Sequence, residues 1–279
     1  MRVLLAETIG FCGGVKRAMR IALDAAARHG GLRTEGPLVH NRAVVELLAR
    51  HGVSDHPENA LHPLLIRAHG VPPDWRRARM EDNVDLVDAT CIHVAGNQRR
   101  AEDAARAGET VLIAGDANHA EVKAVAGCAG PSCRVVGSVA DIERLAAEVD
   151  GPVFLLAQTT FDIALFEDMA RALLRRPDAR VADTICRATH TRQREARDLA
   201  RRVDAVVVVG GADSANTRRL AETARAEGRP AFVVETAAEL IEEDFLGFTI
   251  VGVTSGASTP DWMTHEAADR LRHMGGGIS

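Results

Sequence analysis

The chain has 279 residues and a formal net charge of −5, with acidic and basic residues interleaved rather than gathered into a basic stripe. This charge pattern argues against nucleic acid as a partner. No apolar run reaches the roughly 18 residues that a membrane span needs, and Met1-Arg2 leads straight into a strand pattern instead of a secretory leader. We therefore expect a cytoplasmic protein.

Taken in chain order, short aliphatic runs alternate with amphipathic segments, which is typical of an α/β protein with parallel sheets. We expect strands at 3–5, 84–90, 111–113, 134–136, 152–160, 179–185, 205–209, 231–234 and 249–253, with further strand ends after the apolar runs at 37–39 and 65–66. We expect helices at 13–30, 41–52, 72–80, 93–106, 139–149, 162–176, 191–203, 214–228, 237–243 and 260–274, and a short one from 119.

Three of the five cysteines occupy the same kind of position, after a strand-like run and before a helical pattern. They are Cys12, Cys91 and Cys186. A polar residue follows each of them at a distance of 28 residues, again just after an apolar run: His40, His119 and Ser214. A third strand end then follows in each segment, near His69, Thr159 and Ser258. We interpret this as three copies of one α/β unit, at 1–90, 91–185 and 186–279.

Ligands of parallel sheets gather beyond the carboxyl ends of the strands, so three such units facing a common axis would bring these strand ends to one place. Free cysteines in a cytoplasmic chain point to metal binding, catalysis or burial rather than to disulfides. Three thiolates without a fourth favour a catalytic centre, such as a 4Fe-4S cluster with one open iron, and zinc with a bound water is the alternative. Cys128 and Cys133 lie outside the pattern in a turn-rich loop, and we expect them to be bystanders.

The other polar residues at the strand ends suit an anionic ligand. Neutral donors and histidines next to helix amino-termini provide hydrogen bonds and positive potential. The expected ligand-binding residues are His40, His69, His119, Thr159, Ser214, Asn216 and Ser258. Glu121 is the carboxylate close enough in sequence to His119 to act as a proton donor, a role that burial favours by raising the pKa of a carboxyl group.

Two common nucleotide-binding motifs are missing from the sequence. There is no GxGxxG and no GxxxxGK[ST], so neither a nicotinamide cofactor nor ATP is indicated. If the reaction is a reduction, its electrons must come from another protein or from a diffusible reductant.

Over nearly its whole length the sequence resembles the 4-hydroxy-3-methylbut-2-enyl diphosphate reductase family, the last enzyme of the non-mevalonate route of isoprenoid synthesis. The cysteine motifs that carry the resemblance are Gly10-Phe11-Cys12-Gly13-Gly14-Val15, Asp88-Ala89-Thr90-Cys91 and Thr184-Ile185-Cys186-Arg187-Ala188-Thr189 with Arg192-Gln193. The others are Val39-His40-Asn41, Ala68-His69-Gly70, His119-Ala120-Glu121-Val122, Gln158-Thr159-Thr160, Ser214-Ala215-Asn216 and Gly256-Ala257-Ser258-Thr259-Pro260-Asp261.

The resemblance implies a trefoil of three pseudo-symmetric α/β units around a central 4Fe-4S cluster ligated by Cys12, Cys91 and Cys186. It implies diphosphate binding by His40, His69, His119, Ser214, Asn216 and Ser258, and it gives proton delivery and the substrate hydroxyl to Glu121 and Thr159. The implied reaction is reductive dehydroxylation to isopentenyl and dimethylallyl diphosphate, with ferredoxin or flavodoxin as electron donor.

Four residues depart from the family pattern. Ile92 and Ala120 each replace a proline, Ala215 replaces a serine, and His190 replaces a threonine. These changes leave two alternatives open: a divergent relative that reduces another allylic or anionic substrate, and a non-catalytic iron–sulfur protein that binds a ligand or senses redox state. Retention of Glu121 together with the anion-binding residues favours the enzyme, since a sensor needs neither.

Overall fold

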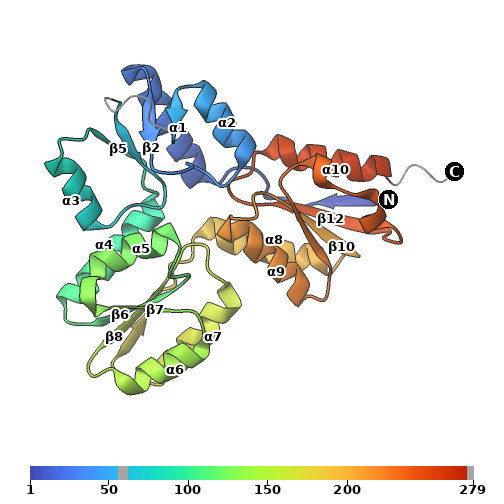
Figure 1. Cartoon of the computed structure of the whole chain (residues 1–279). Coiled ribbons are helices and arrows are strands. Elements are labelled where there is room, and N and C mark those ends of the chain that lie inside the picture. The colour runs from blue at the N-terminus through green and yellow to red at the C-terminus, as the bar shows by residue number, and fades with distance from the viewer. Residues whose placement is uncertain (56–61, 275–279) are drawn as a thin grey trace. The chain divides into compact units, whose positions relative to one another are not determined.

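The computed structural model describes residues 1–55 and 62–274, which form three four-stranded sheets in which every strand pairing is parallel (Figure 1). Sheet A contains, in order, β1 (Arg2–Leu5), β12 (Ile250–Ser255), β10 (Ala205–Val209) and β11 (Ala231–Val234). Sheet B contains β5 (Leu86–Asp88), β4 (Leu64–Ile66), β2 (Leu32–Thr34) and β3 (Val53–Ser54). Sheet C contains β9 (Ala179–Val181), β8 (Val153–Ala157), β6 (Thr110–Ala114) and β7 (Cys133–Val136).

The three sheets repeat one strand order. In each of them the strand that leads to a cysteine lies at an edge, as β1, β5 and β9. The α/β class with three repeated sheets is therefore confirmed. Because β1 pairs with β12, the first strand of the chain completes the sheet formed by the last segment. Division of the chain into units at 90 and 185 stays a prediction.

The residues of the chain pack into two compact units. Unit 1 comprises 1–16, 39–50 and 187–279 and holds sheet A, and unit 2 comprises 17–38 and 51–186 and holds sheets B and C. The helices are α1 (Gly13–His29), α2 (Arg42–Arg50), α3 (Pro73–Glu81), α4 (Ile92–Arg106), α5 (Ala120–Ala129), α6 (Val139–Glu148), α7 (Ile163–Leu173), α8 (Arg187–Ala200), α9 (Ala215–Ala226) and α10 (Asp261–Met274). None of the helices in the described ranges has the length and apolar character needed to cross a membrane.

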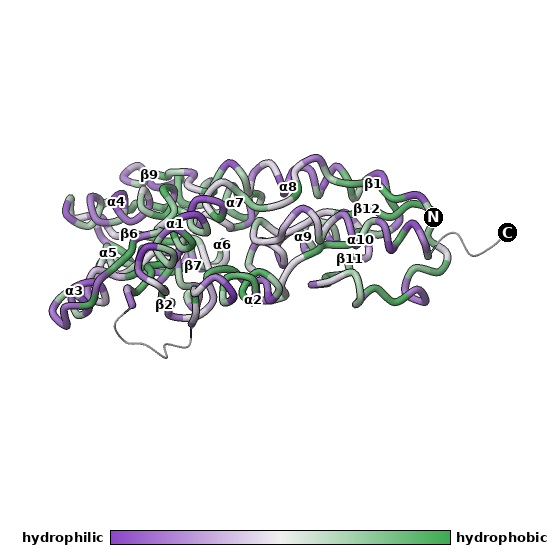
Figure 2. The backbone as a smooth tube through the Cα atoms, turned by 90° about the horizontal axis from the view of Figure 1, so that it is seen from above, coloured by the Kyte–Doolittle hydropathy of each residue, from purple (hydrophilic) through white to green (hydrophobic). Residues whose placement is uncertain are grey.

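Sheet C is buried on both faces, because helices cover each of them. Side chains that alternate along a strand therefore pack against different helices. Val111 and Ile113 pack with α4 and α5, whereas Leu112 and Ala114 pack with α6 and α7. Sheet A is covered in the same way, by α8 and α9 on one face and by α10 on the other. Figure 2 shows the resulting contrast between hydrophobic strands such as β12 and the hydrophilic helix α3.

Strand register places the loops of neighbouring strands side by side at the carboxyl edge. Ala114 at the end of β6 pairs with Ala157 at the end of β8, and Val209 at the end of β10 pairs with Ser255 at the end of β12. Polar residues in the loops after these strands therefore share one edge of their sheet, which is the edge where ligands of parallel sheets bind.

Some predicted elements differ in the structure. The helix expected at 237–243 is wrong: two 3-10 helices, Ala237–Glu239 and Glu242–Phe245, stand there instead. A capping box between Thr236 and Glu239 closes the first turn, and an extended link at Leu240 and Ile241 lets both Leu240 and Phe245 reach the core of sheet A. The strand end expected after 37–39 is wrong, since no strand lies there. The short strands β2 and β3 were not predicted, because two or three residues are too few to show a strand period.

Candidate active site

The three strand-end cysteines are anchored by the same backbone hydrogen bond. Each donates its N–H to the carbonyl two residues past the end of the neighbouring strand, over 3.0 Å: Cys12 to Ala257, Cys91 to Ala68 and Cys186 to Thr159. A helix begins at the next residue in every case, as α1, α4 and α8. One local geometry is therefore built three times, and it puts each thiol at a helix amino-terminus, where negative charge on a ligand atom is favoured.

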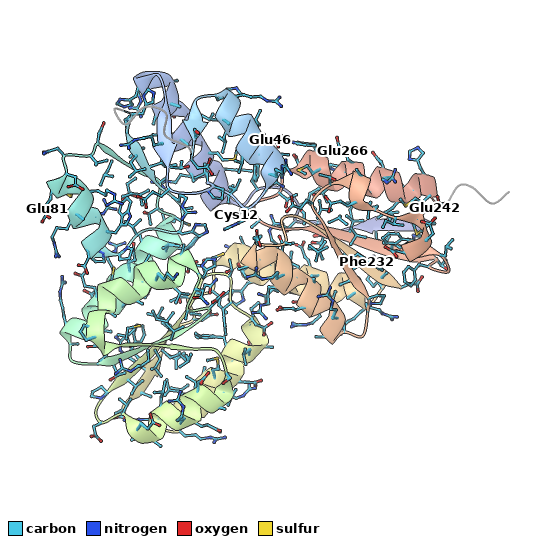
Figure 3. The ribbon with its side chains drawn as sticks, viewed as in Figure 1. Cys12, Glu46, Glu81, Phe232, Glu242 and Glu266 are labelled. Atoms are coloured by element: carbon cyan, nitrogen blue, oxygen red, sulfur yellow. The ribbon has the colours of Figure 1, made fainter. Side chains whose placement is uncertain are left out.

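Cys12 shows this geometry most fully, at the start of α1 (Figure 3). Its Sγ accepts the N–H of Val15 over 3.5 Å, and its carbonyl accepts the N–H of Lys16 over 3.0 Å. The thiol therefore takes part in capping the helix. A thiolate in this position would receive a backbone hydrogen bond as well as the positive end of the helix dipole.

The cysteines divide between the two units, with Cys12 in unit 1 and Cys91 and Cys186 in unit 2. None of the three is in a disulfide, and each is half-buried. Within either unit, over the described residues, no group of three or more His, Cys, Asp or Glu side chains forms a metal site by itself. The donor set nevertheless fits an iron–sulfur cluster, which takes cysteine thiolates as ligands.

Cys128 and Cys133 differ from these three. Burial raises the pKa of both thiols to about 11, and the charge of Glu102 adds to the effect at Cys128. Both side chains are therefore neutral thiols near pH 7. Cys133 lies at the start of β7 and Cys128 within α5, away from the carboxyl ends of the strands.

Glu121 is the buried acid of unit 2. It lies in the first turn of α5, is 2% exposed, and contacts the loop after β8 through both carboxylate oxygens. The backbone N–H of Thr159 donates to Oε1 over 2.6 Å, and the Thr159 hydroxyl donates to Oε2 over 2.6 Å. Since the Thr159 carbonyl in turn accepts the N–H of Cys186, a continuous path of contacts links the carboxyl group to the backbone of a strand-end cysteine.

Burial raises the pKa of Glu121 to about 7, while the two hydrogen bonds from Thr159 act in the opposite direction. The desolvation cost of the charged form prevails. Near neutral pH the carboxyl group therefore populates both protonation states, as a general acid requires. In the protonated form Oε2–H can donate to the Thr159 hydroxyl, which leaves the proton of that hydroxyl available to a third group.

Two histidines lie together in unit 2. The rings of His69 and His119 stand edge to face with centroids 5.3 Å apart. His119 caps α5, because its Nδ1 accepts the N–H of Glu121 over 3.2 Å. A ring nitrogen that accepts carries no proton, so His119 is neutral there and presents Nε2–H as a donor.

Unit 1 holds the predicted polar residues of sheet A. Ser214 caps α9 and its hydroxyl accepts the N–H of Thr217 over 3.3 Å. Asn216 in the first turn of α9 and Ser258 in the loop after β12 are 4% and 9% exposed. Neither the Asn216 amide group nor the Ser258 hydroxyl has a hydrogen-bond partner among the described residues. Buried polar groups without partners are costly, so this pair indicates a polar ligand at the carboxyl edge of sheet A.

His40 belongs to the same unit and lies against the loop after β10. A Cβ on Gly211 would come within 2.2 Å of the His40 carbonyl oxygen, so only glycine allows this approach. The structure thus groups the predicted residues into two sets. Unit 1 has Cys12, His40, Ser214, Asn216 and Ser258, and unit 2 has Cys91, Cys186, His69, His119, Glu121 and Thr159.

The departures from the family pattern concern the first turns of helices. Ile92, Ala120 and Ala215 are the first residues of α4, α5 and α9, and Ile92 is 67% exposed. Ala215 carries no hydroxyl, and the Thr217 hydroxyl two residues later, like that of Ser258, has no hydrogen-bond partner among the described residues. Thr217 is completely buried, with its Oγ1 packed against Gly210 and Gly256.

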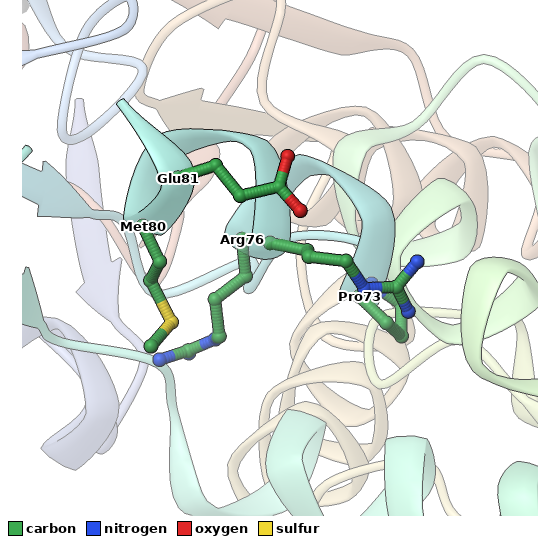
Figure 4. A pocket seen from close by; sticks show the side chains of 5 residues that line it. Pro73, Arg76, Met80 and Glu81 are labelled. Atoms are coloured by element: carbon green, nitrogen blue, oxygen red, sulfur yellow. The ribbon is translucent and has the colours of Figure 1, made fainter. Parts of the chain in front are cut away.

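A surface pocket of about 450 Å³ lies on α3, lined by Pro73, Arg76, Arg77, Met80 and Glu81 (Figure 4). None of these is a predicted site residue. Arg76 pairs with Asp88, and Arg77 pairs with Asp74 over 3.6 Å. The pocket therefore contains none of the residues expected to bind the ligand or to deliver a proton.

Arg192 was not predicted as a site residue, although it holds the loop before Cys12. Arg192 is 2% exposed, and its guanidinium donates to the carbonyls of Thr8, Gly10 and Ser255. Its presence in the third cysteine motif was the available signal. A buried arginine and its three carbonyl partners leave no periodic pattern in a sequence.

The fold places the chain among α/β proteins whose ligand sites lie beyond the carboxyl ends of parallel strands. A family model described as LytB protein matches residues 3–272. The chain therefore belongs to the LytB protein family, as its motifs indicated.

Relatives and solved structures agree with this assignment. A 4-hydroxy-3-methylbut-2-enyl diphosphate reductase of Nitratidesulfovibrio vulgaris is 44% identical over 278 residues, which cover 93% of this chain and 95% of that protein. The solved structure of an (E)-4-hydroxy-3-methyl-but-2-enyl diphosphate reductase, called the terminal enzyme of the non-mevalonate pathway, is 34% identical with a TM-score of 0.67, covering 98% of this chain and all of that one. The E-1-hydroxy-2-methyl-but-2-enyl-4-diphosphate reductase of Plasmodium falciparum has the same fold, with a TM-score of 0.89 at 24% identity, and covers 97% and 87% of the two chains.

Proposed function

We propose that this protein is a cytoplasmic iron–sulfur reductase that converts 4-hydroxy-3-methylbut-2-enyl diphosphate to isopentenyl and dimethylallyl diphosphate. The conversion takes two electrons and two protons and releases one water. The relatives that match the whole chain carry this activity in their names. The observation that carries the proposal is the buried Glu121 carboxyl group, which contacts Thr159 through both oxygens and has a pKa near 7.

The role of Glu121 follows from its contacts. The allylic hydroxyl must leave as water, and it needs a proton to do so. Protonated Glu121 can donate to the Thr159 hydroxyl, whose own proton then points to the substrate hydroxyl. Burial raises the pKa of this carboxyl group to about 7, so a substantial fraction of it carries the proton near neutral pH.

The diphosphate would be bound by neutral donors. Asn216 and Ser258 have buried polar groups without partners, and Ser214 stands at the amino-terminus of α9, which attracts anions. In unit 2, His119 presents Nε2–H beside the ring of His69. In unit 1, His40 contributes from its position against Gly211. Neutral donors bind a diphosphate without removing the proton from Glu121.

The redox chemistry needs a group that the side chains lack. A 4Fe-4S cluster held by Cys12, Cys91 and Cys186 would supply the electrons and one open iron that acts as a Lewis acid toward the substrate oxygen. The three cysteines share one anchor geometry, and Cys128 and Cys133 stay protonated, which supports the first set as the ligands. Ferredoxin or flavodoxin is the proposed electron donor, since no nucleotide-binding motif occurs in the chain.

Replacement of Glu121 by glutamine tests the proposal. Glu121→Gln keeps the volume and the contacts with Thr159 but removes the acid, so kcat should fall by about 10²- to 10⁴-fold. Cluster content and KM should stay near wild type. Glu109→Gln is the matched control, since Glu109 lies in the same unit and forms an ion pair with the exposed Arg180 instead of contacting Thr159. A Glu121→Gln protein within a few-fold of wild-type kcat would place the proton donor elsewhere.

A further inference from the structure

The helix that follows each cysteine carries a side chain that contacts the segment leading to another cysteine. After Cys12, α1 carries the half-buried Arg17, whose Nη1 donates to the carbonyl of Thr90 over 3.0 Å. Thr90 directly precedes Cys91. An arginine on the helix of the first cysteine thus fixes the backbone immediately before the second.

The helix after Cys186 makes the most extensive contact of this kind. From α8, the Arg192 guanidinium donates to the carbonyls of Thr8 (3.0 Å) and Gly10 (2.6 Å) in the loop before Cys12. One turn later, Glu195 accepts the Thr8 N–H over 2.7 Å and the Thr8 hydroxyl over 2.6 Å. Both ends of the Thr8 residue are therefore held, and Gly10 lies two residues before Cys12.

The third helix completes the pattern. From α4, which follows Cys91, the buried Asn97 amide donates to the carbonyl of Ala157 over 3.1 Å. The hydroxyl of Thr184, two residues before Cys186, donates to this same carbonyl over 2.7 Å and accepts the Ala157 N–H over 2.8 Å. One peptide group thus links Asn97 to the segment that leads to Cys186.

We propose that the helix after each cysteine positions the next cysteine in a closed cycle, from Cys12 to Cys91, from Cys91 to Cys186 and from Cys186 back to Cys12. Arg17, Asn97 and Arg192 are the positioning residues. The loops are then held before any cluster is bound, so cluster binding does not have to bear the entropy cost of ordering them. The inference rests on the three cysteines of the proposed function, but on neither the substrate nor the reaction.

Alkylation rates of the individual cysteines in the full chain, freed of any cluster and kept reduced, test this cycle. Arg192→Met should raise the rate at Cys12 by at least about tenfold, because charged hydrogen bonds to buried carbonyls are lost and the loop opens locally. The rates at Cys91 and Cys186 should stay within about twofold. Arg17→Met should act on Cys91, and Asn97→Ala on Cys186. Peptide mass spectrometry with iodoacetamide reads all five cysteines at once.

Two controls separate positioning from general loss of structure. Arg197→Met removes another arginine of α8, one that pairs with Glu227 over 3.4 Å, and should change none of the three rates. Cys128 and Cys133 report global unfolding, and their rates should stay constant. Arg192→Lys restores the charge and part of the hydrogen bonding, so its Cys12 rate should lie between those of wild type and Arg192→Met.

The proposal is overturned if each variant acts on the cysteine that heads its own helix, or if the three cysteines always respond together. If Arg192→Met unfolds, all five thiols will react. The test then rests on whether Arg17→Met raises the rate at Cys91 and Asn97→Ala the rate at Cys186. The electron paramagnetic resonance signal of the reconstituted, reduced protein gives a second measure, because displacement of one ligand should change it in Arg192→Met and not in Arg197→Met. Thiol rates in the cluster-free chain do not depend on turnover, so a failure of the cycle and a failure of the reductase proposal are distinguishable.

Discussion

Glu121 is deeply buried and its carboxylate accepts two hydrogen bonds from Thr159, so its protonation state affects the stability of the fold. Its pKa is raised from 4.5 to about 7. A raised carboxyl pKa means that the folded protein holds the proton more tightly than the unfolded chain does. The corresponding stability is fully present below pH 4.5 and is lost as the pH rises through about 7.

We predict that wild type loses about 2 kcal/mol of unfolding free energy relative to Glu121→Gln between pH 5.5 and pH 8. Glutamine keeps the contacts with Thr159 but cannot ionise, so the variant lacks this dependence. Urea unfolding of both proteins at the two pH values measures the difference. Parallel curves for the two proteins over this range would show that Glu121 titrates near its ordinary pKa.

A second prediction at the residue scale concerns the anion-binding hydroxyl groups of unit 1. Ser258→Ala removes a buried hydroxyl without another partner, so KM for the diphosphate substrate should rise by roughly 10- to 150-fold. Ala215→Ser restores the hydroxyl that the family pattern has, and its KM should stay within about threefold of wild type, because Ser214, Asn216 and Ser258 already donate. A tenfold drop in KM for Ala215→Ser would instead favour a divergent relative with another natural substrate.

At the scale of elements, the sequence predicted the long strands and helices well. The amphipathic pattern of α1 has the period of a helix, and the short run of valines at β10 has the length and the β-branched residues of a buried strand. Short elements such as β2 are held by pairing with distant strands, which no local pattern records. The prediction of a helix at 237–243 was wrong for a similar reason. Burial of Leu240 and Phe245 in the core of sheet A interrupts a helix that the local sequence allows.

The loop after β10 gives a prediction at this scale. Gly211→Ala should lower the unfolding temperature and raise KM, because a Cβ would overlap the His40 carbonyl and force the two loops apart. Gly137→Ala is the matched control, since its nearest neighbour atom would be 4.0 Å away. Thermal unfolding and steady-state kinetics of both variants measure the effect. A Gly211→Ala protein as stable and active as Gly137→Ala would mean that His40 is not held against this loop.

For the whole molecule, the sequence predicted that the three cysteines occupy equivalent positions between a strand and a helix. In the structure, the backbone N–H of each of them donates the same kind of hydrogen bond to the loop after the neighbouring strand. The proton-donor role of Glu121 was predicted from its distance to His119 in the sequence, and Thr159 was predicted as a donor at a strand end. Only their shared part in proton delivery was implied by the resemblance. The contacts of Arg17, Asn97 and Arg192 could not be predicted. Each joins a helix to a backbone carbonyl far away in the chain, and a carbonyl has no residue-type signature.

We propose that this chain reduces an allylic diphosphate at an iron–sulfur cluster held by the three anchored cysteines. The measurement that tests it most directly is anaerobic conversion of 4-hydroxy-3-methylbut-2-enyl diphosphate by the reconstituted protein with a chemical reductant, with iron and sulfide determined on each sample. We predict isopentenyl and dimethylallyl diphosphate from wild type and from Cys128→Ser, and loss of both cluster and product in Cys12→Ser, Cys91→Ser and Cys186→Ser. A wild-type protein that holds the cluster but forms neither product would contradict the account.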